Sequence, residues 1–173
     1  MAPSAWHRRL DLVYLAFFII HVPIMFAVDL YPLYPLSLRP PFLADLRSWY
    51  IATYKDRFFT EEQPAWFWMF TVMEAGWHVP IGLTSIKPLW KGDHSPMLHL
   101  RLLLFAFQTA LTTAVCVVEY TSWPELSAAE KSSLGGLYIP YLIFSLVMFA
   151  DMYGRVKARL MATGESSHKS NSS

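Results

Sequence analysis

Charged side chains and cysteine are both scarce in this 173-residue chain. Asp, Glu, Lys and Arg make up 16% of it, against about 25% of an ordinary soluble domain. The net charge is only +1, which gives no electrostatic reason to expect a nucleic-acid partner. The single cysteine, Cys116, excludes an intrachain disulfide and fits no cysteine metal motif. These scarcities argue against a disulfide-stabilised secreted domain and a basic nucleic-acid-binding domain.

Apolar residues are abundant instead, at 54% of the chain. They gather in four segments, each near the roughly 20 residues needed to cross a bilayer, at residues 10–30, 66–86, 98–118 and 134–153. We therefore predict an all-α membrane protein, a four-transmembrane-helix bundle forming one domain over residues 1–155. The first segment is expected to stay as a helix rather than to be cleaved as a signal peptide. The basic, serine-rich residues 156–173 are expected to be disordered.

The long connection between the first two spans carries its own pattern. It opens with a proline-rich stretch that cannot form a regular helix. Leu43, Leu46, Tyr50 and Tyr54 then recur at helical spacing, which predicts an amphipathic loop helix at the membrane face. The amino terminus, second connection and tail carry nine Lys and Arg residues, against five in the first and third connections. This bias predicts that both termini are cytosolic.

Two carboxylates lie within or at the end of predicted spans. Glu74 stands well inside the second span, where an ionisable group costs roughly 2.5–3.5 kcal/mol on insertion scales and marks a functional site by default. Asp29 stands near the far end of the first span. With straight helices the two acids differ in depth by roughly 10 Å, and a kink at Pro23 would shrink that gap. Both occupy the half of the membrane away from the cytosol, so they could face one cavity.

A shared cavity would suit a hydrophobic amine. Two close carboxylates in a low dielectric are expected to share a proton and to hold one ammonium group. Nearby aromatic residues would supply apolar walls and cation–π faces, namely Trp49, Tyr50, Trp66, Trp77, Tyr138 and Tyr141.

Plainer interpretations stay open for these residues. Asp29 could sit at the headgroup level, and Glu74 could hydrogen-bond the threonines of the third span. His21 is more often a bundle histidine than a ligand contact. His78 follows Glu74 by one turn, yet no HExxH sequence is present and we expect no metal site.

An ordered set of residues resembles the EXPERA family of membrane proteins, and within it the sigma-2 receptor branch rather than the emopamil-binding sterol isomerases. The resemblance covers about residues 8–155. It is carried by His21-x-Pro23, Asp29-Leu30, Trp49-Tyr50, Lys55-Asp56, Pro64-Ala-Trp-Phe67, Glu74, Pro80 and Tyr138-x-Pro-Tyr-Leu142.

The resemblance implies a four-span protein of the endoplasmic-reticulum membrane, with the nuclear envelope and endolysosomal membranes as alternatives. It further implies a homodimer that binds sterols and hydrophobic amines and works with a larger lysosomal sterol transporter. Asp29 and Glu74 would form the polar centre of the ligand site, and Asp56 would have a structural role. The remaining ligand-binding residues would be His21, Met25, Trp49, Tyr50, His78, Tyr138 and Tyr141.

The main alternative is a sterol Δ8–Δ7 isomerase, which needs an acid, a base and a site that stabilises the intervening cation. The resemblance implies that the isomerases pair a histidine with a glutamate one turn later and carry a second glutamate in the next helix. Here His21 matches that histidine and Glu74 matches the second glutamate, but one turn after His21 stands Met25, which cannot move a proton. Asp29 could in principle substitute for the missing acid, so the enzyme stays an alternative. We therefore predict a binder without catalytic residues or cofactor. A chaperone or quality-control factor for other membrane proteins is a third class.

Overall fold

The computed structural model describes residues 5–60 and 63–170, with side chains described as far as residue 163. Helices dominate, and no strand is found within those ranges. The α-helices are α1 (Ala5–Ile24), α2 (Pro41–Tyr54), α3 (Ala65–Met73), α4 (Val79–Lys91), α5 (Pro96–Ser122) and α6 (Ala128–Ser170). Between them lie the π-helical segments η1 (Met25–Asp29) and η5 (Glu74–His78), and the short 3₁₀ turns η2 (Tyr31–Leu33), η3 (Leu36–Leu38) and η4 (Arg57–Phe59).

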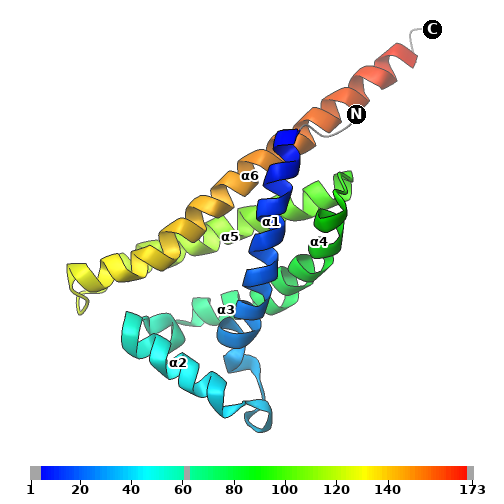
Figure 1. Ribbon diagram of the computed structural model, residues 1–173. Coiled ribbons are helices and arrows are strands. Elements are labelled where there is room, and N and C mark those ends of the chain that lie inside the picture. Colours follow the sequence, from blue (N-terminus) through cyan, green and yellow to red (C-terminus); the bar gives the residue numbers. More distant parts are fainter. Residues whose placement is uncertain (1–4, 61–62, 171–173) are drawn as a thin grey trace.

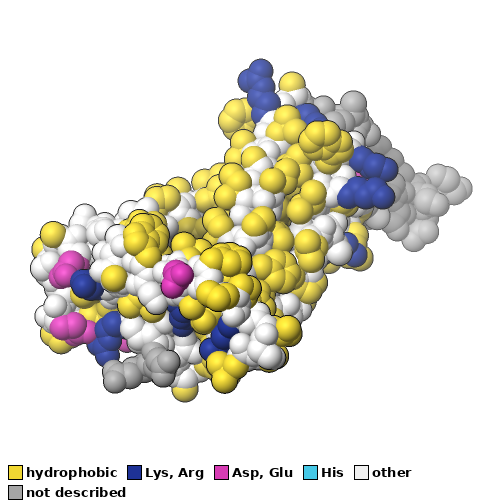
Figure 2. Space-filling view, turned by 60° about the horizontal axis from the view of Figure 1, so that its bottom comes forward, with side chains coloured by type: hydrophobic (Ala, Val, Ile, Leu, Met, Phe, Trp, Pro, Cys, Tyr) yellow, Lys and Arg dark blue, Asp and Glu magenta, His cyan; other side chains and the backbone are white. Residues whose placement is uncertain are grey.

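Three helical stretches of the described chain are long and apolar enough to cross a membrane: Ala5–Asp29, Pro96–Ser122 and Ala128–Thr163. The predicted second span corresponds to α3, η5 and α4 in succession, which is not one of these three. The outward faces carry large apolar side chains, including Ile20 at 62% and Val118 at 71% exposure. Figure 2 shows such side chains over much of the visible surface. Apolar surface of this extent fits contact with lipid rather than water.

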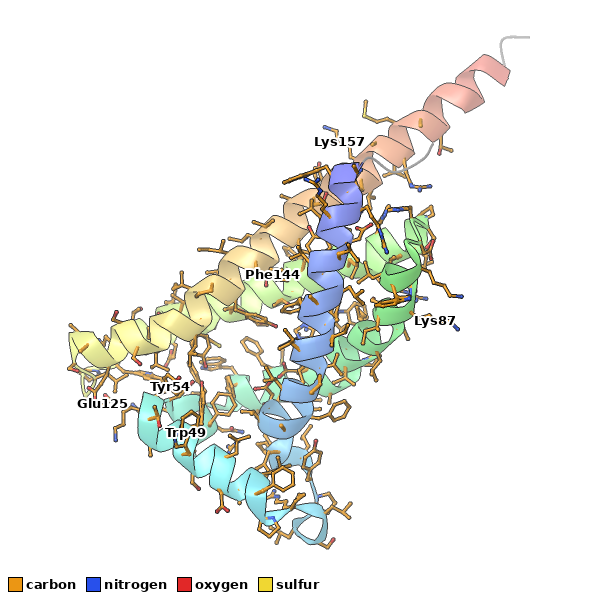
Figure 3. The ribbon with its side chains drawn as sticks, viewed as in Figure 1. Trp49, Tyr54, Lys87, Glu125, Phe144 and Lys157 are labelled. Carbon is orange, nitrogen blue, oxygen red and sulfur yellow. The ribbon has the colours of Figure 1, made fainter. Side chains whose placement is uncertain are left out.

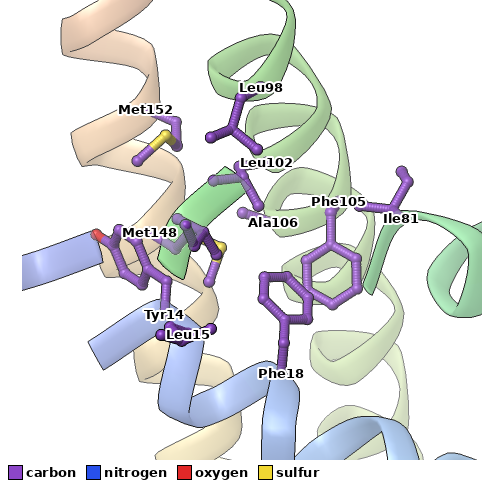
Figure 4. Packing of buried hydrophobic residues seen from close by; sticks show 11 residues of the cluster. Tyr14, Leu15, Phe18, Ile81, Leu98, Leu102, Phe105, Ala106, Met148 and Met152 are labelled. Carbon is purple, nitrogen blue, oxygen red and sulfur yellow. The ribbon is translucent and has the colours of Figure 1, made fainter. Parts of the chain in front are cut away.

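The helices pack in two pairs. Helices α5 and α6 run along each other, and α1 packs against α4 (Figure 1). Their shared core contains Tyr14, Phe18, Leu102, Phe105 and Met148, each at most 1% exposed. Figure 4 shows these side chains meeting from α1, α5 and α6, with Ile81 of α4 beside them. This core fixes the positions of α1, α4, α5 and α6 relative to one another.

Polar contacts gather at one end of the bundle. Asp11 is 2% exposed and accepts a 2.7 Å hydrogen bond from the Arg155 guanidinium, which also pairs with Asp151 at 2.7 Å. Arg8 donates from its guanidinium to the carbonyls of Leu89 and Trp90. These contacts join α1, the end of α4 and α6.

The opposite end is formed by α2, η4 and the turn between α5 and α6. Arg57 pairs with Glu125 and lies over the Trp123 ring. In Figure 3, Tyr54 and Glu125 lie at this end and Lys157 at the other. The connection that carries α2 and η4 and the turn between α5 and α6 therefore lie at the same end of the molecule.

In the structure α6 continues through Ser170, into residues 156–173, and disorder of that tail stays a prediction. Contacts hold the helix where the tail begins: Arg155 binds Asp11 and Asp151, and Arg159 donates to the His94 carbonyl. A helix anchored in this way is extended by good helix formers such as those in Lys157-Ala-Arg-Leu-Met. Residues 171–173 of the predicted tail lie outside the described residues.

Candidate functional site

A cavity of about 570 Å³ opens between α1, α2, α3, η5, α5 and α6. Its wall is mostly apolar and aromatic, with Val28, Phe59, Phe67, Phe70 and Leu137 contributing. Eight of the nine predicted ligand-binding residues line it, namely His21, Asp29, Trp49, Tyr50, Glu74, His78, Tyr138 and Tyr141. The structure thus brings together residues that are separated by up to 120 positions in the sequence.

The two carboxylates come from the two π-helical segments. Asp29 is the last residue of η1, where the Leu30 amide donates to the Met25 carbonyl at 2.9 Å. Glu74 is the first residue of η5, and the Glu74 backbone carbonyl accepts a hydrogen bond from the Val79 amide. Pro23 and Pro80 stand beside these segments, and proline disturbs the regular hydrogen-bond ladder because it lacks an amide hydrogen. Single π turns often occur at functional sites, and here each one sets a carboxylate against the cavity.

Neither carboxylate has a hydrogen bond or ion pair within the part of the chain that the structure describes. Both side chains are half-buried and face the cavity. The alternative in which Glu74 bonds the threonines of α5 is not what the structure shows: Thr112 bonds the carbonyls of Gln108 and Thr109 in its own helix. The acids are therefore left to a ligand, to water or to each other.

His21 lies on the α1 side of the cavity. Its Nε2 atom is 3.0 Å from the Tyr141 hydroxyl of α6, and its ring stacks on Phe17 with centroids 4.8 Å apart. The histidine is therefore held in one orientation by an aromatic face and a hydrogen bond. It tethers α1 to α6 beside the carboxylates.

His78 lies on the η5 side of the cavity. It is 5% exposed, its ring lies 4.7 Å from that of Phe105, and its Nε2 atom is 3.5 Å from the Thr109 hydroxyl. Met25 does not line the cavity; it is completely buried with Val22 and Val79. A methionine here fills the space between α1 and α4, which is why the sequence prediction for Met25 is not supported by its position.

Asp56 lies behind the cavity wall with no exposed surface. Its Oδ2 atom accepts hydrogen bonds from the hydroxyls of Tyr50 at 2.9 Å and Tyr138 at 2.7 Å, and its Oδ1 atom accepts from the Phe58 amide at 3.0 Å. Burial raises the pKa of Asp56 above its ordinary value, and the hydrogen bonds from Tyr138 and Tyr50 oppose that shift. One carboxylate thus joins α2, η4 and α6 and positions two tyrosines of the cavity.

The outer wall is formed in part by α2. Trp49 lines the cavity while 57% of its surface remains exposed, so it stands at the rim. Figure 3 places it on α2, away from the long helices. Trp66 and Trp77, which the sequence suggested as wall residues, are not lining residues.

Several lining residues were not predicted as ligand contacts. They include three aromatic residues, Phe59, Phe67 and Phe70, and the polar residues Thr71, Gln108, Thr109, Thr112 and Thr113. The polar residues of α5 give a detectable signal, because they interrupt an apolar span at helical spacing. The aromatic residues give none, since aromatic side chains occur throughout this chain.

A metal centre is not suggested by this arrangement. No group of three or more His, Cys, Asp or Glu side chains that could hold a metal ion is found in the described residues. The cavity instead offers two free carboxylates, two histidines and several hydroxyls on an apolar wall. Such a site can neutralise a cation and hydrogen-bond a hydroxyl while its wall excludes water.

Comparison with known proteins agrees with this description. The chain is 26% identical over 154 residues to sigma intracellular receptor 2 of Xenopus tropicalis, covering 84% of this chain and 88% of the relative. The human protein of the same name is 24% identical, with 88% and 92% covered. Efficient mitochondria targeting-associated protein 19 of Schizosaccharomyces pombe is 29% identical, with 86% and 77% covered. The EXPERA (EXPanded EBP superfamily) family model matches residues 42–152, well over half of the sequence, so the chain belongs to the EXPERA family.

Proposed function

We propose that this protein is a non-catalytic intramembrane binder of hydrophobic cationic amines and sterols. The observation that carries the proposal is the pair of carboxylates, Asp29 and Glu74, left without protein partners in an otherwise apolar cavity. A carboxylate in apolar surroundings is stabilised by a cation that it can bond directly. Small-molecule sites measure about 300–1,000 Å³, and this cavity of about 570 Å³ falls within that range.

The rest of the site fits the same ligand class. Phe67, Phe70 and Tyr138 offer aromatic faces on the cavity wall, which suit both the hydrocarbon of a sterol and the cationic head of an amine. The name of the animal relatives, sigma intracellular receptor 2, describes those proteins as receptors. A receptor-like role for this chain is consistent with that name.

The proposal includes a fourth membrane span made of α3, η5 and α4. Together they run from Ala65 to Lys91, and a helix of that length reaches about 40 Å at 1.5 Å per residue. A fourth crossing is also supported by the arrangement of the connections at two opposite ends of the bundle. The α2 helix would then lie at the membrane face, and both termini would be cytosolic.

The cellular setting follows from the family resemblance and is part of the proposal. We expect the protein in the endoplasmic-reticulum membrane as a homodimer, acting in sterol homeostasis with a lysosomal sterol transporter as partner. Separate detection of epitope tags at the two termini in selectively permeabilised cells tests the orientation. Tags that are both accessible from the cytosol support it, and a tag protected in the lumen overturns it.

Saturation binding of a radiolabelled guanidine or piperidine amphiphile tests the ligand site. Wild-type membranes are compared with Asp29→Asn and Glu74→Gln, and with Asp45→Asn on the exposed face of α2 as a matched control. We expect saturable binding that is lost in both cavity variants and kept in the control. Absence of saturable binding to wild-type protein that is shown to be folded would overturn the proposed ligand site.

A sterol isomerase is the alternative that shares this cavity. It is favoured by the presence of His21, Asp29 and Glu74 in one cavity, which supplies groups able to move protons. Against it, Met25 is buried away from the cavity and carries no transferable proton. Conversion of a Δ8-sterol to its Δ7 isomer by purified protein, abolished in Glu74→Gln, would show that the protein is an isomerase and would overturn the proposal of a non-catalytic binder.

A role in assisting other membrane proteins is the second candidate. It is favoured by the name of the yeast relatives, which refers to efficient mitochondria targeting. Detergent-stable co-purification of one defined membrane protein, unaffected by Asp29→Asn, would support this role. Loss of that association in Asp29→Asn would show that the association depends on the ligand cavity and would contradict a separate role in assisting membrane proteins.

A further inference from the structure

The cavity contains polar side chains besides the carboxylates. They include His78, which follows Glu74 by about one turn in η5, and Gln108 of α5, both of which line the cavity. The Thr109 hydroxyl lies 3.5 Å from His78 Nε2, and Gln108 is the neighbouring residue on the same helix. The contact between Thr109 and His78 joins η5 to α5, the helix that carries Gln108.

Each of these side chains has one buried atom left without a partner. His78 Nδ1 and Gln108 Nε2 are both inaccessible to solvent and have no hydrogen bond within the described residues. A buried polar atom without a partner is unfavourable by about 1–3 kcal/mol, so such atoms usually meet a ligand or an ordered water. Both atoms belong to residues that line one cavity, which makes them candidates for contact with a polar ligand atom.

The neighbouring hydroxyl groups do not supply that partner. The Thr112 hydroxyl is used by the carbonyls of Gln108 and Thr109. Thr109 approaches the other nitrogen of His78, Nε2. The histidine ring is held against Phe105, so its Nδ1 atom keeps its position on the wall.

The missing group is best supplied by a hydroxyl. A hydroxyl both donates and accepts, so it can accept from the Gln108 amide and donate to an unprotonated His78 Nδ1 at the same time. An ammonium cannot accept, and a carbonyl cannot donate. We propose that His78 and Gln108 form a hydroxyl-binding subsite that recognises the alcohol of a sterol-like ligand, in addition to the cation site at Asp29 and Glu74.

This inference rests on the proposed binding function and predicts two separable sources of affinity. Amines without a hydroxyl would depend on Asp29 and Glu74 and not on Gln108. A neutral sterol would depend on its alcohol and on Gln108. Loss of one neutral hydrogen bond changes affinity by about 3- to 10-fold.

The test uses full-length protein in lipid nanodiscs and a radiolabelled piperidine without a hydroxyl group. Cholesterol and cholest-5-ene, which share a skeleton but differ in the 3-hydroxyl, compete for the label. We expect cholesterol to compete about 3- to 10-fold better with wild type. In Gln108→Leu this preference should fall to about onefold, with each competition referred to the affinity of that same variant for the piperidine.

Two further variants make the result specific. His78→Phe keeps a ring against Phe105 but removes both nitrogens, and it should lower the preference in the same way. Thr121→Val, on the exposed surface of α5 outside the cavity, should leave it unchanged. Equal competition by cholesterol and cholest-5-ene in wild type, or an undiminished preference in Gln108→Leu, overturns the subsite and leaves the amine site standing. Absence of any piperidine binding to folded wild type overturns the proposed function itself.

Discussion

Replacing Asp56 by alanine should destabilise the protein more than any change on its surface. The carboxylate is fully buried and accepts three hydrogen bonds, from Tyr50, Tyr138 and the Phe58 amide. A buried group left unpaired is unfavourable by about 1–3 kcal/mol. Because the three effects are not additive, we expect a loss of about 3–5 kcal/mol in the free energy of unfolding. By the scaling for chains of 150–250 residues, the melting temperature should fall by roughly 10 °C.

The single cysteine provides the assay. Cys116 is 5% exposed and belongs to the same core cluster as Phe58 and Tyr120. A thiol-reactive fluorophore therefore reports thermal opening of this cluster in detergent-solubilised protein. Asp56→Asn keeps an oxygen acceptor for the Phe58 amide and should lose about half as much stability.

Asp45→Ala, on the exposed side of α2, is the control and should melt within about 2 °C of wild type. The same variants should be measured for ligand binding, because Tyr50 and Tyr138 line the cavity. A wild-type melting temperature in folded Asp56→Ala would refute the view that this carboxylate joins α2 to α6.

Two further changes test the packing of α1. Arg155→Ala leaves the buried Asp11 carboxylate without its cation and should lower the free energy of unfolding by about 3–5 kcal/mol, whereas the pair Asp11→Leu and Arg155→Met should recover much of it. Both are read by the same melting assay, and no difference between the single and double variants would contradict the ion-pair argument. Gly82→Ala places a methyl group 2.8 Å from Val22 Cγ2 and should cost about 1–3 kcal/mol. A gain in melting temperature would show that α1 and α4 can separate without strain.

Most of the site could be predicted because buried acids are rare in apolar segments. Glu74 interrupts an apolar run, and Asp29 follows another, so both stand out from the sequence. The predicted difference in depth of roughly 10 Å assumed straight helices. The structure instead has a π turn at each acid, and such turns depend on packing between helices that sequence patterns do not describe.

The parts that sequence reasoning missed have specific physical causes. Met25 has the spacing of a cavity residue from His21, but after Pro23 the chain is π-helical, and Met25 packs between α1 and α4 instead. Gln108 was visible as a polar residue in an apolar span, yet only the structure shows that its amide lacks a partner. The helix beyond Arg155 could not be predicted from a basic and serine-rich composition, because its first turns depend on Asp11 and His94, which are distant in sequence.

The central claim is that two unpaired carboxylates in an apolar cavity select a hydrophobic cation. The most direct measurement compares a piperidine amphiphile with its cyclohexyl isostere, in which carbon replaces the basic nitrogen, binding to wild-type protein in nanodiscs. A charged hydrogen bond contributes about 1.5–3 kcal/mol, so the account predicts that the amine binds about 10- to 100-fold more tightly. Equal affinity for the two compounds would contradict it.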